Sequence, residues 1–205
     1  MSVTSEDLER FVVECQSKLD SIQTNLKAFN IFNVLGVQYR EIRHSNFLGW
    51  LFDPNESHQM GDLFFKGLLA LLRKRNLIDE AFYIQLLLKD LSATQVYRET
   101  KHNIDILIVN EDIGFVICVE NKIYADFSKH QLREYYNYVE SHYENLPNKL
   151  FLTLTPKPSY RHHDFCSGKF YTNIDYQMII SLLELNSKYI NQAIPTVKKR
   201  IRENI

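Results

Sequence analysis

The chain has 205 residues, a formal net charge of −1, 45% hydrophobic residues and 24% charged residues. This composition excludes a disordered protein, and the apolar runs fall far short of the roughly 20 residues that cross a bilayer. The near-neutral charge also argues against a protein that grips nucleic acid mainly through phosphates, because such proteins usually carry a basic surplus. The length favours one domain over 1–205, divided into a mainly helical part (1–91), a sheet core (92–175) and C-terminal helices (176–205).

The start of the chain, the cysteines and the basic clusters carry little specific signal. Residues 1–10, MSVTSEDLER, lack the basic start and apolar stretch of a secretory signal, which predicts a cytoplasmic protein. Cys15, Cys118 and Cys166 are odd in number and have no metal-type spacing, so we interpret them as structural thiols. We interpret the basic runs at 73–75, 157–163 and 198–202 as solvated charged faces.

Helical spacing dominates the first half of the chain. Residues 6–29 place apolar side chains three and four positions apart, as in an amphipathic helix. A second helix is expected from about Ser45 until Asp53-Pro54 interrupts it. Two more are expected over 62–75 and 78–91.

Strand patterns follow from residue 94. The segments 94–99, 103–110 and 114–121 are short, rich in branched and aromatic residues and separated by polar turns, which predicts three strands. A helix over 127–143, a strand over 149–155, a short strand over 168–174 and a helix capped by Asp175 follow. This order predicts an α/β fold with a mixed sheet and helices on both faces.

The segments 103–110 and 114–121 fit a hairpin with residues 111–114, EDIG, as a four-residue loop. Asn110 then pairs with Phe115, and counting back puts Asp105 opposite Glu120. Because side chains alternate along a strand, Glu120 and Lys122 share the face of Asp105. The prediction depends on this register, since a slip of one residue sends Asp105 to the other face.

The three ionisable groups at the end of this apolar surface, Asp105, Glu120 and Lys122, allow two interpretations. Two close carboxylates repel each other unless a cation lies between them, and oxygen ligands suit Mg²⁺ or Mn²⁺. A metal-bound water and a nearby lysine would then favour phosphodiester hydrolysis. Alternatively, Asp105 and Lys122 form a strand-end salt bridge while Glu120 is merely solvated.

The segments "NIDILI" and "VICVENKI" resemble the bipartite motif of the PD-(D/E)XK nuclease superfamily. Asp105 matches the first acid, Glu120 the second and Lys122 the lysine, with Asn121 at the variable position. Ile104 replaces the proline that often precedes the first acid. Upstream, residues 40–69 resemble the helical signature of an uncharacterised branch, in which Glu-x-x-His-Ser precedes a helix that ends in Asp-Pro. Downstream, "HQLREYYNYVE" resembles the helix that follows the lysine strand in that branch.

The resemblance implies a restriction-endonuclease-like αβββαβ core with an added N-terminal helical layer. It also implies that Asp105 and Glu120 ligate the metal, with the Val119 carbonyl as a further ligand, and that Lys122 orients the attacking water. Glu41 matches an acid that many members supply from the first helix to complete the metal site.

Other matched positions have weaker assignments. Gln131 is expected to reach the site from the helix after the sheet. Tyr135, one helical turn further on, either faces the site or belongs to the core. His44 and Ser45 match the branch signature without a derivable role, and a surface histidine and an N-cap serine fit them equally.

The leading functional hypothesis is therefore a nuclease dependent on Mg²⁺ or Mn²⁺ that acts on DNA. One rival is a nuclease fold that recognises nucleic acid or protein without cleaving, and another is a structural domain with a salt-bridge cluster. The superfamily often cuts as a homodimer, so a homodimer is a further expectation, and no membrane partner is expected. The chain ends on "VKKRIRENI", where Pro195 could open a helix that runs straight into the last residue, so a missing C-terminal region is a further expectation.

Overall fold

The computed structural model describes residues 36, 40–123, 127–157, 163–166 and 169–186. The chain divides into two compact units, Met1–Gln38 and Tyr39–Ile205, and the second contains the sheet and the motif. The helix expected over 6–29 and the expected C-terminal continuation lie outside the described residues. A single domain over 1–205 therefore stays a prediction.

The second unit is built on a six-stranded sheet with the order β1-β2-β3-β4-β6-β5. The sheet is mixed, because β1, β2 and β3 pair antiparallel, β3, β4 and β6 pair parallel, and β5 returns antiparallel on β6. The strands are β1 (Gln95–Tyr97), β2 (Ile106–Asn110), β3 (Phe115–Asn121), β4 (Asn148–Thr155), β5 (His163–Cys166) and β6 (Lys169–Asp175). The predicted α/β class and mixed sheet are confirmed.

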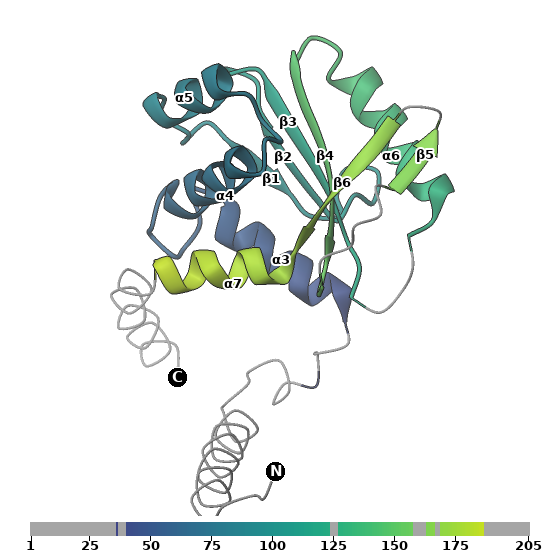
Figure 1. Ribbon diagram of the computed structural model, residues 1–205, viewed down its shortest axis with the longest axis horizontal. Helices are drawn as coiled ribbons and strands as arrows, with labels where there is room; N and C mark the ends of the chain where they lie inside the picture. Colours follow the sequence, from purple (N-terminus) through teal and green to yellow (C-terminus); the bar gives the residue numbers. More distant parts are fainter. Residues whose placement is uncertain (1–35, 37–39, 124–126, 158–162, 167–168, 187–205) are drawn as a thin grey trace, which may run out of the picture. The chain divides into compact units, whose positions relative to one another are not determined.

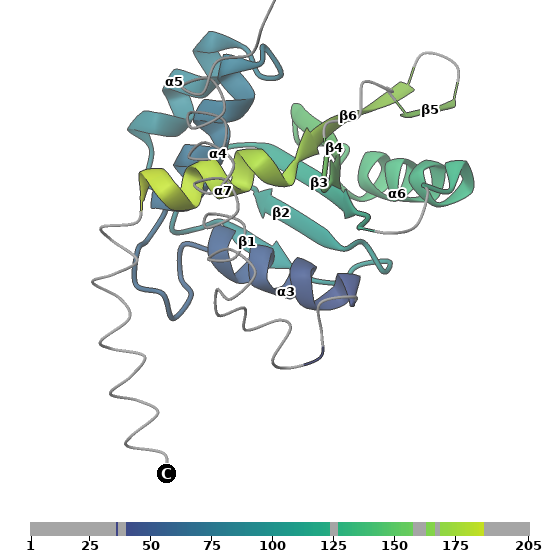
Figure 2. The same cartoon turned by 60° about the horizontal axis from the view of Figure 1, so that its bottom comes forward.

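Helices cover both faces of the sheet (Figure 1). On one face lie α3 (Glu41–Phe52), α4 (Leu63–Lys74), α5 (Glu80–Leu88) and α7 (Tyr176–Leu185), which share a core with Ile106, Ile108 and Ile117. On the other face lies α6 (Lys129–His142), which packs on Leu107, Val116 and Cys118 through Leu132, Tyr135 and Val139. Figure 2 shows α4 and α5 on one side of the strands and α6 on the other. All seven residues of β3 are buried, as its continuous apolar run requires.

The hairpin has the predicted register. Asn110 pairs with Phe115, and the ladder continues through Leu107 opposite Cys118 to Ile106 opposite Val119. Gly114 closes the four-residue loop with φ +84°, a left-handed conformation that glycine adopts without steric cost. The period-2 alternation of both strands therefore separates the two cores as expected from the sequence.

Two expectations were wrong. The helix expected from about Ser45 begins at Glu41, and its N-cap residue, Arg40, makes no side-chain capping bond, so the sequence held no signal for this start. Ser45 is consequently not an N-cap but a buried residue inside α3. The edge strand β5 was also missed, because its four residues are too few to show alternation.

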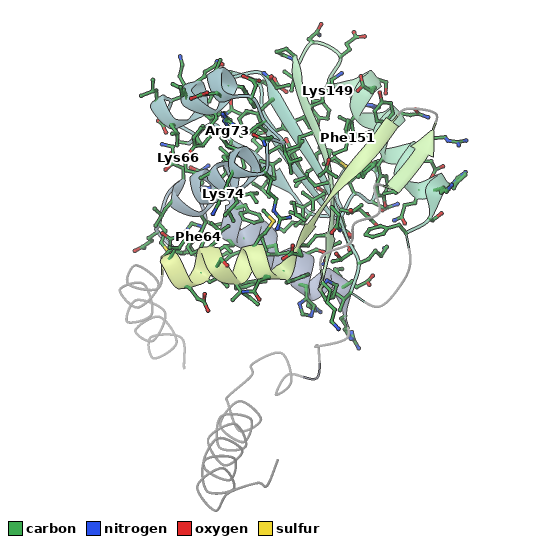
Figure 3. All side chains as sticks on the ribbon, viewed as in Figure 1. Phe64, Lys66, Arg73, Lys74, Lys149 and Phe151 are labelled. Atoms are coloured by element: carbon green, nitrogen blue, oxygen red, sulfur yellow. The ribbon has the colours of Figure 1, made fainter. Side chains whose placement is uncertain are left out.

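Charged side chains fasten helices to the sheet and to one another. Lys149 and Phe151, two residues apart on β4, both contact α6: Lys149 pairs with Glu140 at 2.8 Å, and Phe151 packs on Tyr136 (Figure 3). The basic run at 73–75 ends α4, where Arg73 pairs with an acid of α5 and Arg75 with the cap of α7. At least two residues of this run, Arg73 and Arg75, therefore form ion pairs with neighbouring elements and do not belong to a purely solvated face.

Within the described ranges, no helix has the length and apolar character that a bilayer span requires.

Candidate active site

The candidate site lies where β3 ends, on the face of the sheet that α6 covers. Ile106 pairs with Val119. Asp105, which precedes Ile106, therefore lies opposite Glu120, which follows Val119. Asp105 Oδ2 accepts a 2.7 Å hydrogen bond from the backbone N–H of Asn121, which fixes this carboxylate against the end of β3. The hairpin thus brings the two predicted acids together.

Glu120 is fully buried, with 0% of its surface exposed. Its Oε1 lies 2.8 Å from Nζ of Lys122, an ion-pair distance. Among the described residues, Oε2 of Glu120 has no comparable partner. A buried carboxylate oxygen without a partner costs free energy, so Oε2 is suited to receive a ligand that the protein itself does not supply.

Burial dominates the electrostatics of both acids. It raises the pKa of Glu120, and the neighbouring charge of Asp105 raises it further despite the opposing effect of Lys122. Burial also raises the pKa of Asp105, although the Asn121 N–H and Lys122 act in the other direction. A positive charge placed between the two carboxylates would relieve both effects.

Lys122 completes the group of three and joins it to α3. Burial acts to lower the pKa of Lys122, but the carboxylates of Glu120, Asp105 and Glu41 outweigh burial and raise it. Lys122 is thus held as an ammonium ion, 15% exposed, at the rim of the site. Glu41 Oε2 lies 3.7 Å from Nζ of Lys122, and its Oε1 accepts a 2.8 Å hydrogen bond from the N–H of Ile123. Glu41 therefore buttresses the residues that follow β3.

Asn121 points to the opposite face, as its position in the strand predicts, and links three elements there. Its amide nitrogen donates to Ser45 Oγ at 3.1 Å, and its oxygen accepts from the hydroxyl of Tyr176 at 3.1 Å. Ser45 in turn donates to the carbonyl of Glu41 at 3.2 Å, and His44 lies edge-on to the ring of Tyr176. Ser45 is thus a structural link between α3 and β3.

Gln131 and Tyr135 lie one turn apart on α6, and the expectation that Gln131 reaches the carboxylates stays a prediction. Ser128 caps this helix by accepting from the N–H of Gln131, and the Gln131 amide donates to the Tyr135 hydroxyl at 2.8 Å. That hydroxyl donates to the carbonyl of Asn103 at 2.7 Å. Burial raises the pKa of Tyr135 to about 12, with the charges of the two site acids contributing. Tyr135 is therefore both a core residue and a neighbour of the site.

Two polar residues next to the site were missed in the sequence. Thr153 on β4 is the register partner of Glu120, and Asn173 on β6 is the partner of Thr153. Asn173 donates to Thr153 Oγ1 at 3.3 Å, so a polar row continues from the two acids across the parallel strands. The alternating threonines of "LTLT" were the available signal, but their alignment with Glu120 depends on a parallel register that the sequence does not fix.

The donor set suits a small hard cation. Mg²⁺ is usually held by one or two carboxylates and completes its coordination with water and substrate phosphate. Asp105 and the buried carboxylate of Glu120 match that requirement. Among the described residues, no three of the His, Cys, Asp and Glu side chains are grouped to hold a metal, so Glu41 is not gathered with the other two acids. The ligand roles of Glu41 and the Val119 carbonyl stay predictions.

Comparison with known proteins agrees with this geometry. Residues 29–203 match the family model of the PD-(D/E)XK nuclease superfamily. The chain is also 28% identical over 158 residues to the "Meiotically up-regulated gene 43 protein" of Schizosaccharomyces pombe (strain 972 / ATCC 24843), an alignment that covers 72% of this chain and 57% of the relative. The chain thus spans little more than half of that relative's length, and no solved structure matches. Because the family match covers most of the chain, this protein belongs to the PD-(D/E)XK nuclease superfamily.

Proposed function

We propose that the protein is a nuclease that hydrolyses phosphodiester bonds in DNA and depends on Mg²⁺ or Mn²⁺. The observation that carries this proposal is the fully buried carboxylate of Glu120, which lies close enough to a second acid, Asp105, for that charge to raise its pKa. A second acid, Asp105, and an ammonium ion, Lys122, lie beside it. Two carboxylates and a lysine at one strand end are the chemistry that a metal-assisted phosphoryl transfer needs.

Asp105, Glu120 and the Val119 carbonyl would hold the ion. A bound divalent ion supplies Lewis acidity, which makes a water more acidic and offsets negative charge on the phosphate. Lys122 stays protonated, so it orients the attacking water and stabilises charge on the phosphate rather than removing a proton. Glu41 keeps the ammonium ion at the rim of the site.

The decisive experiment compares metal binding and cleavage in two variants. Mn²⁺ binding is measured by titration calorimetry, and cleavage on plasmid and single-stranded DNA with Mg²⁺ or Mn²⁺. Asp105→Asn should lose both metal binding and cleavage. Lys122→Gln should bind Mn²⁺ but cleave about 10²-fold to 10³-fold more slowly, the usual effect of removing one charge-stabilising donor.

Lys149→Gln is the matched control. Lys149 is also largely buried, lies on the same face of the sheet and pairs with a glutamate at 2.8 Å, but α6 holds that glutamate away from the carboxylate pair. This variant should cleave like the unaltered protein. Cleavage that survives both Asp105→Asn and Lys122→Gln would refute the catalytic assignment. Metal binding without cleavage would instead support a recognition module, and no carboxylate-dependent metal binding would support a salt-bridge cluster.

A further inference from the structure

Aromatic and imidazole rings form a continuous row between the loop before Asp105 and the second half of α6. The ring of His102 stacks on that of Tyr138, with centroids 5.0 Å apart and planes 1° apart. Tyr138 also stacks on His142, at 4.0 Å and 26°. Both histidines are exposed, whereas most aromatic stacks of this kind lie inside a core. The row therefore places two exposed imidazole rings on the surface, stacked on a half-buried tyrosine ring.

The backbone holds these rings in place. His102 and Asn103 have φ values of 55° and 60°, a conformation that is costly for residues other than glycine and persists only where neighbours enforce it. The enforcing contacts are the hydrogen bond from Tyr135 to the Asn103 carbonyl and that from the Ile104 N–H to the Lys101 carbonyl. On the helix, His142 Nδ1 lies 3.0 Å from the Tyr138 carbonyl. The stack is thus pre-formed rather than assembled on binding.

A surface hollow of about 450 Å³ runs along this row. Besides the three stacked rings, it is lined by Glu134, Asn137 and Ser141. The carboxylate of Glu134 disfavours a phosphate inside the hollow, whereas carboxylate, amide and hydroxyl groups suit the polar edge of a nucleobase. A cation lies on the neighbouring loop, where Lys101 Nζ is 4.9 Å from the ring centroid of Tyr97.

The row is continuous with the candidate active site through Tyr135. The ring of His102 also meets Tyr135 edge-on at 6.3 Å, and Tyr135 responds to the charges of Asp105 and Glu120. From Tyr135 to His142 the helix rises by roughly 10 Å, so a strand whose phosphate reaches the carboxylates has its neighbouring nucleotides near the rings.

We propose that the exposed rings of His102 and His142, held in place by Tyr138, form a stacking platform for unpaired bases of a single-stranded stretch of the DNA substrate. The proposal rests on the proposed function for the identity of the strand that enters the site. Base stacking on exposed rings is sequence-tolerant and needs few cations, which fits a chain of net charge −1. A base inside a duplex is already stacked, so the platform selects single-stranded or locally opened DNA.

The test is a binding experiment on the full chain in EDTA, so that binding is measured without cleavage. Fluorescence anisotropy compares a strand of about ten thymidines with a strand of equal length and charge whose central nucleotides lack bases. The unaltered protein should bind the complete strand about tenfold or more tightly, as base–aromatic stacking typically provides. The variant His102→Ala/His142→Ala should bind both strands alike, at the level of the abasic strand. Because both residues are exposed, this variant retains the core.

Two controls isolate the rings. His130→Ala removes another exposed imidazole from the same helix, outside the stack, and should keep the preference for bases. Tyr138→Phe retains the aromatic ring and should also retain the preference for the strand that carries bases. Equal binding of the two strands by the unaltered protein, or an unchanged preference in the double histidine variant, would overturn the platform. The platform would also be overturned if a duplex of the same sequence bound more tightly than the single strand and its binding did not depend on the two histidines.

The outcome for the platform is separable from that for the nuclease. A base preference that depends on the histidines, in a protein that cleaves no DNA, would support the platform and refute the proposed function. Metal-dependent cleavage without any base preference would do the reverse.

Discussion

The carboxylate of Glu120 lies at a buried position, where water does not solvate it. The side chain is fully buried, Lys122 lies beside one oxygen, and Asp105 adds a second acid. In the metal-free protein, the charged form of Glu120 is therefore disfavoured, and its pKa is raised by burial first and by Asp105 second. The burial that suits Glu120 to the proposed metal site thus lowers the free energy of unfolding of the metal-free protein.

The first prediction concerns the pH dependence of stability in EDTA. An unfolded glutamate has a pKa of about 4.3, and the folded value is higher, so between them the native state binds more protons than the unfolded state. Stability is therefore fully present below the unfolded pKa and is lost as the pH rises through the folded pKa. The loss is about 1.4 kcal/mol for each unit by which the pKa is raised.

Glu120→Gln should remove most of this loss. Urea unfolding at about pH 5 and about pH 8.5 measures it, with both proteins compared at each pH. Glu140→Gln, which removes a more exposed acid paired with Lys149, should keep the pH dependence of the unaltered protein. A parallel pH dependence for Glu120→Gln and the unaltered protein would show that Glu120 is charged and well solvated in the fold.

At the scale of elements, the site depends on how α3 is fastened to β3. Glu41 and Ser45 lie one turn apart on α3, and they contact opposite sides of the strand end: Glu41 meets Lys122 and Ile123, and Ser45 meets Asn121. This explains the glutamate and the serine of the Glu-x-x-His-Ser pattern as a pair. The spacing of four residues puts both side chains on the helix face that adjoins β3.

The second prediction is that Ser45→Ala destabilises the protein by about 1–3 kcal/mol, because the buried amide nitrogen of Asn121 loses its hydrogen bond to Ser45. Cleavage should also fall, because the substitution weakens the link between α3, which carries Glu41, and the end of β3. Urea unfolding and the plasmid assay measure the two effects. Ser181→Ala is the matched control: Ser181 makes the same bond to the carbonyl four residues earlier, but on an exposed site of α7. An equal, small effect of both substitutions would contradict the structural role of Ser45.

At the scale of the whole molecule, electrostatics supports weak contact with the phosphate backbone. The net charge is −1, and many basic side chains of the described residues pair with acids, namely Lys66, Arg73, Arg75, Arg98, Lys122 and Lys149. Charges held in such pairs release few counterions on binding DNA. Affinity should then depend on bases more than on phosphates.

The third prediction is a shallow salt dependence. Each phosphate neutralised on a single strand contributes about −0.7 to the slope of log K against log salt, so two or three contacts give a slope of about −1.4 to −2.1. Anisotropy titrations between about 50 and 200 mM salt measure it on the unaltered chain. A slope steeper than about −5 would show that binding rests on an extensive basic surface and would contradict this view.

Much of the sheet could be predicted from local chemistry. The hairpin register followed from loop length and alternation, and it correctly placed Asp105 opposite Glu120 and Asn121 on the other face. Asp175 was also predicted correctly as a cap, since its carboxylate accepts from the N–H of Met178. These features depend on residues close in the sequence, where geometry leaves few alternatives.

Features that depend on distant segments could not be predicted. Thr153 and Asn173 align with Glu120 only through parallel pairing, and parallel partners are separated by a crossover whose length fixes no register. The stack of His102 on Tyr138 depends on a left-handed backbone at His102 and Asn103, and no glycine in that loop indicates it in the sequence. The start of α3 lacked a capping residue.

The place of β3 in the sheet has a consequence for motion. It is the third of six strands, hydrogen-bonded on both sides and buried at every residue. Backbone amides on such strands exchange with solvent mainly through the rare opening of the whole domain, whereas loops open locally and often. Glu120 therefore lies in a slowly exchanging part of the described fold, and its carboxylate keeps its position as long as the protein is folded.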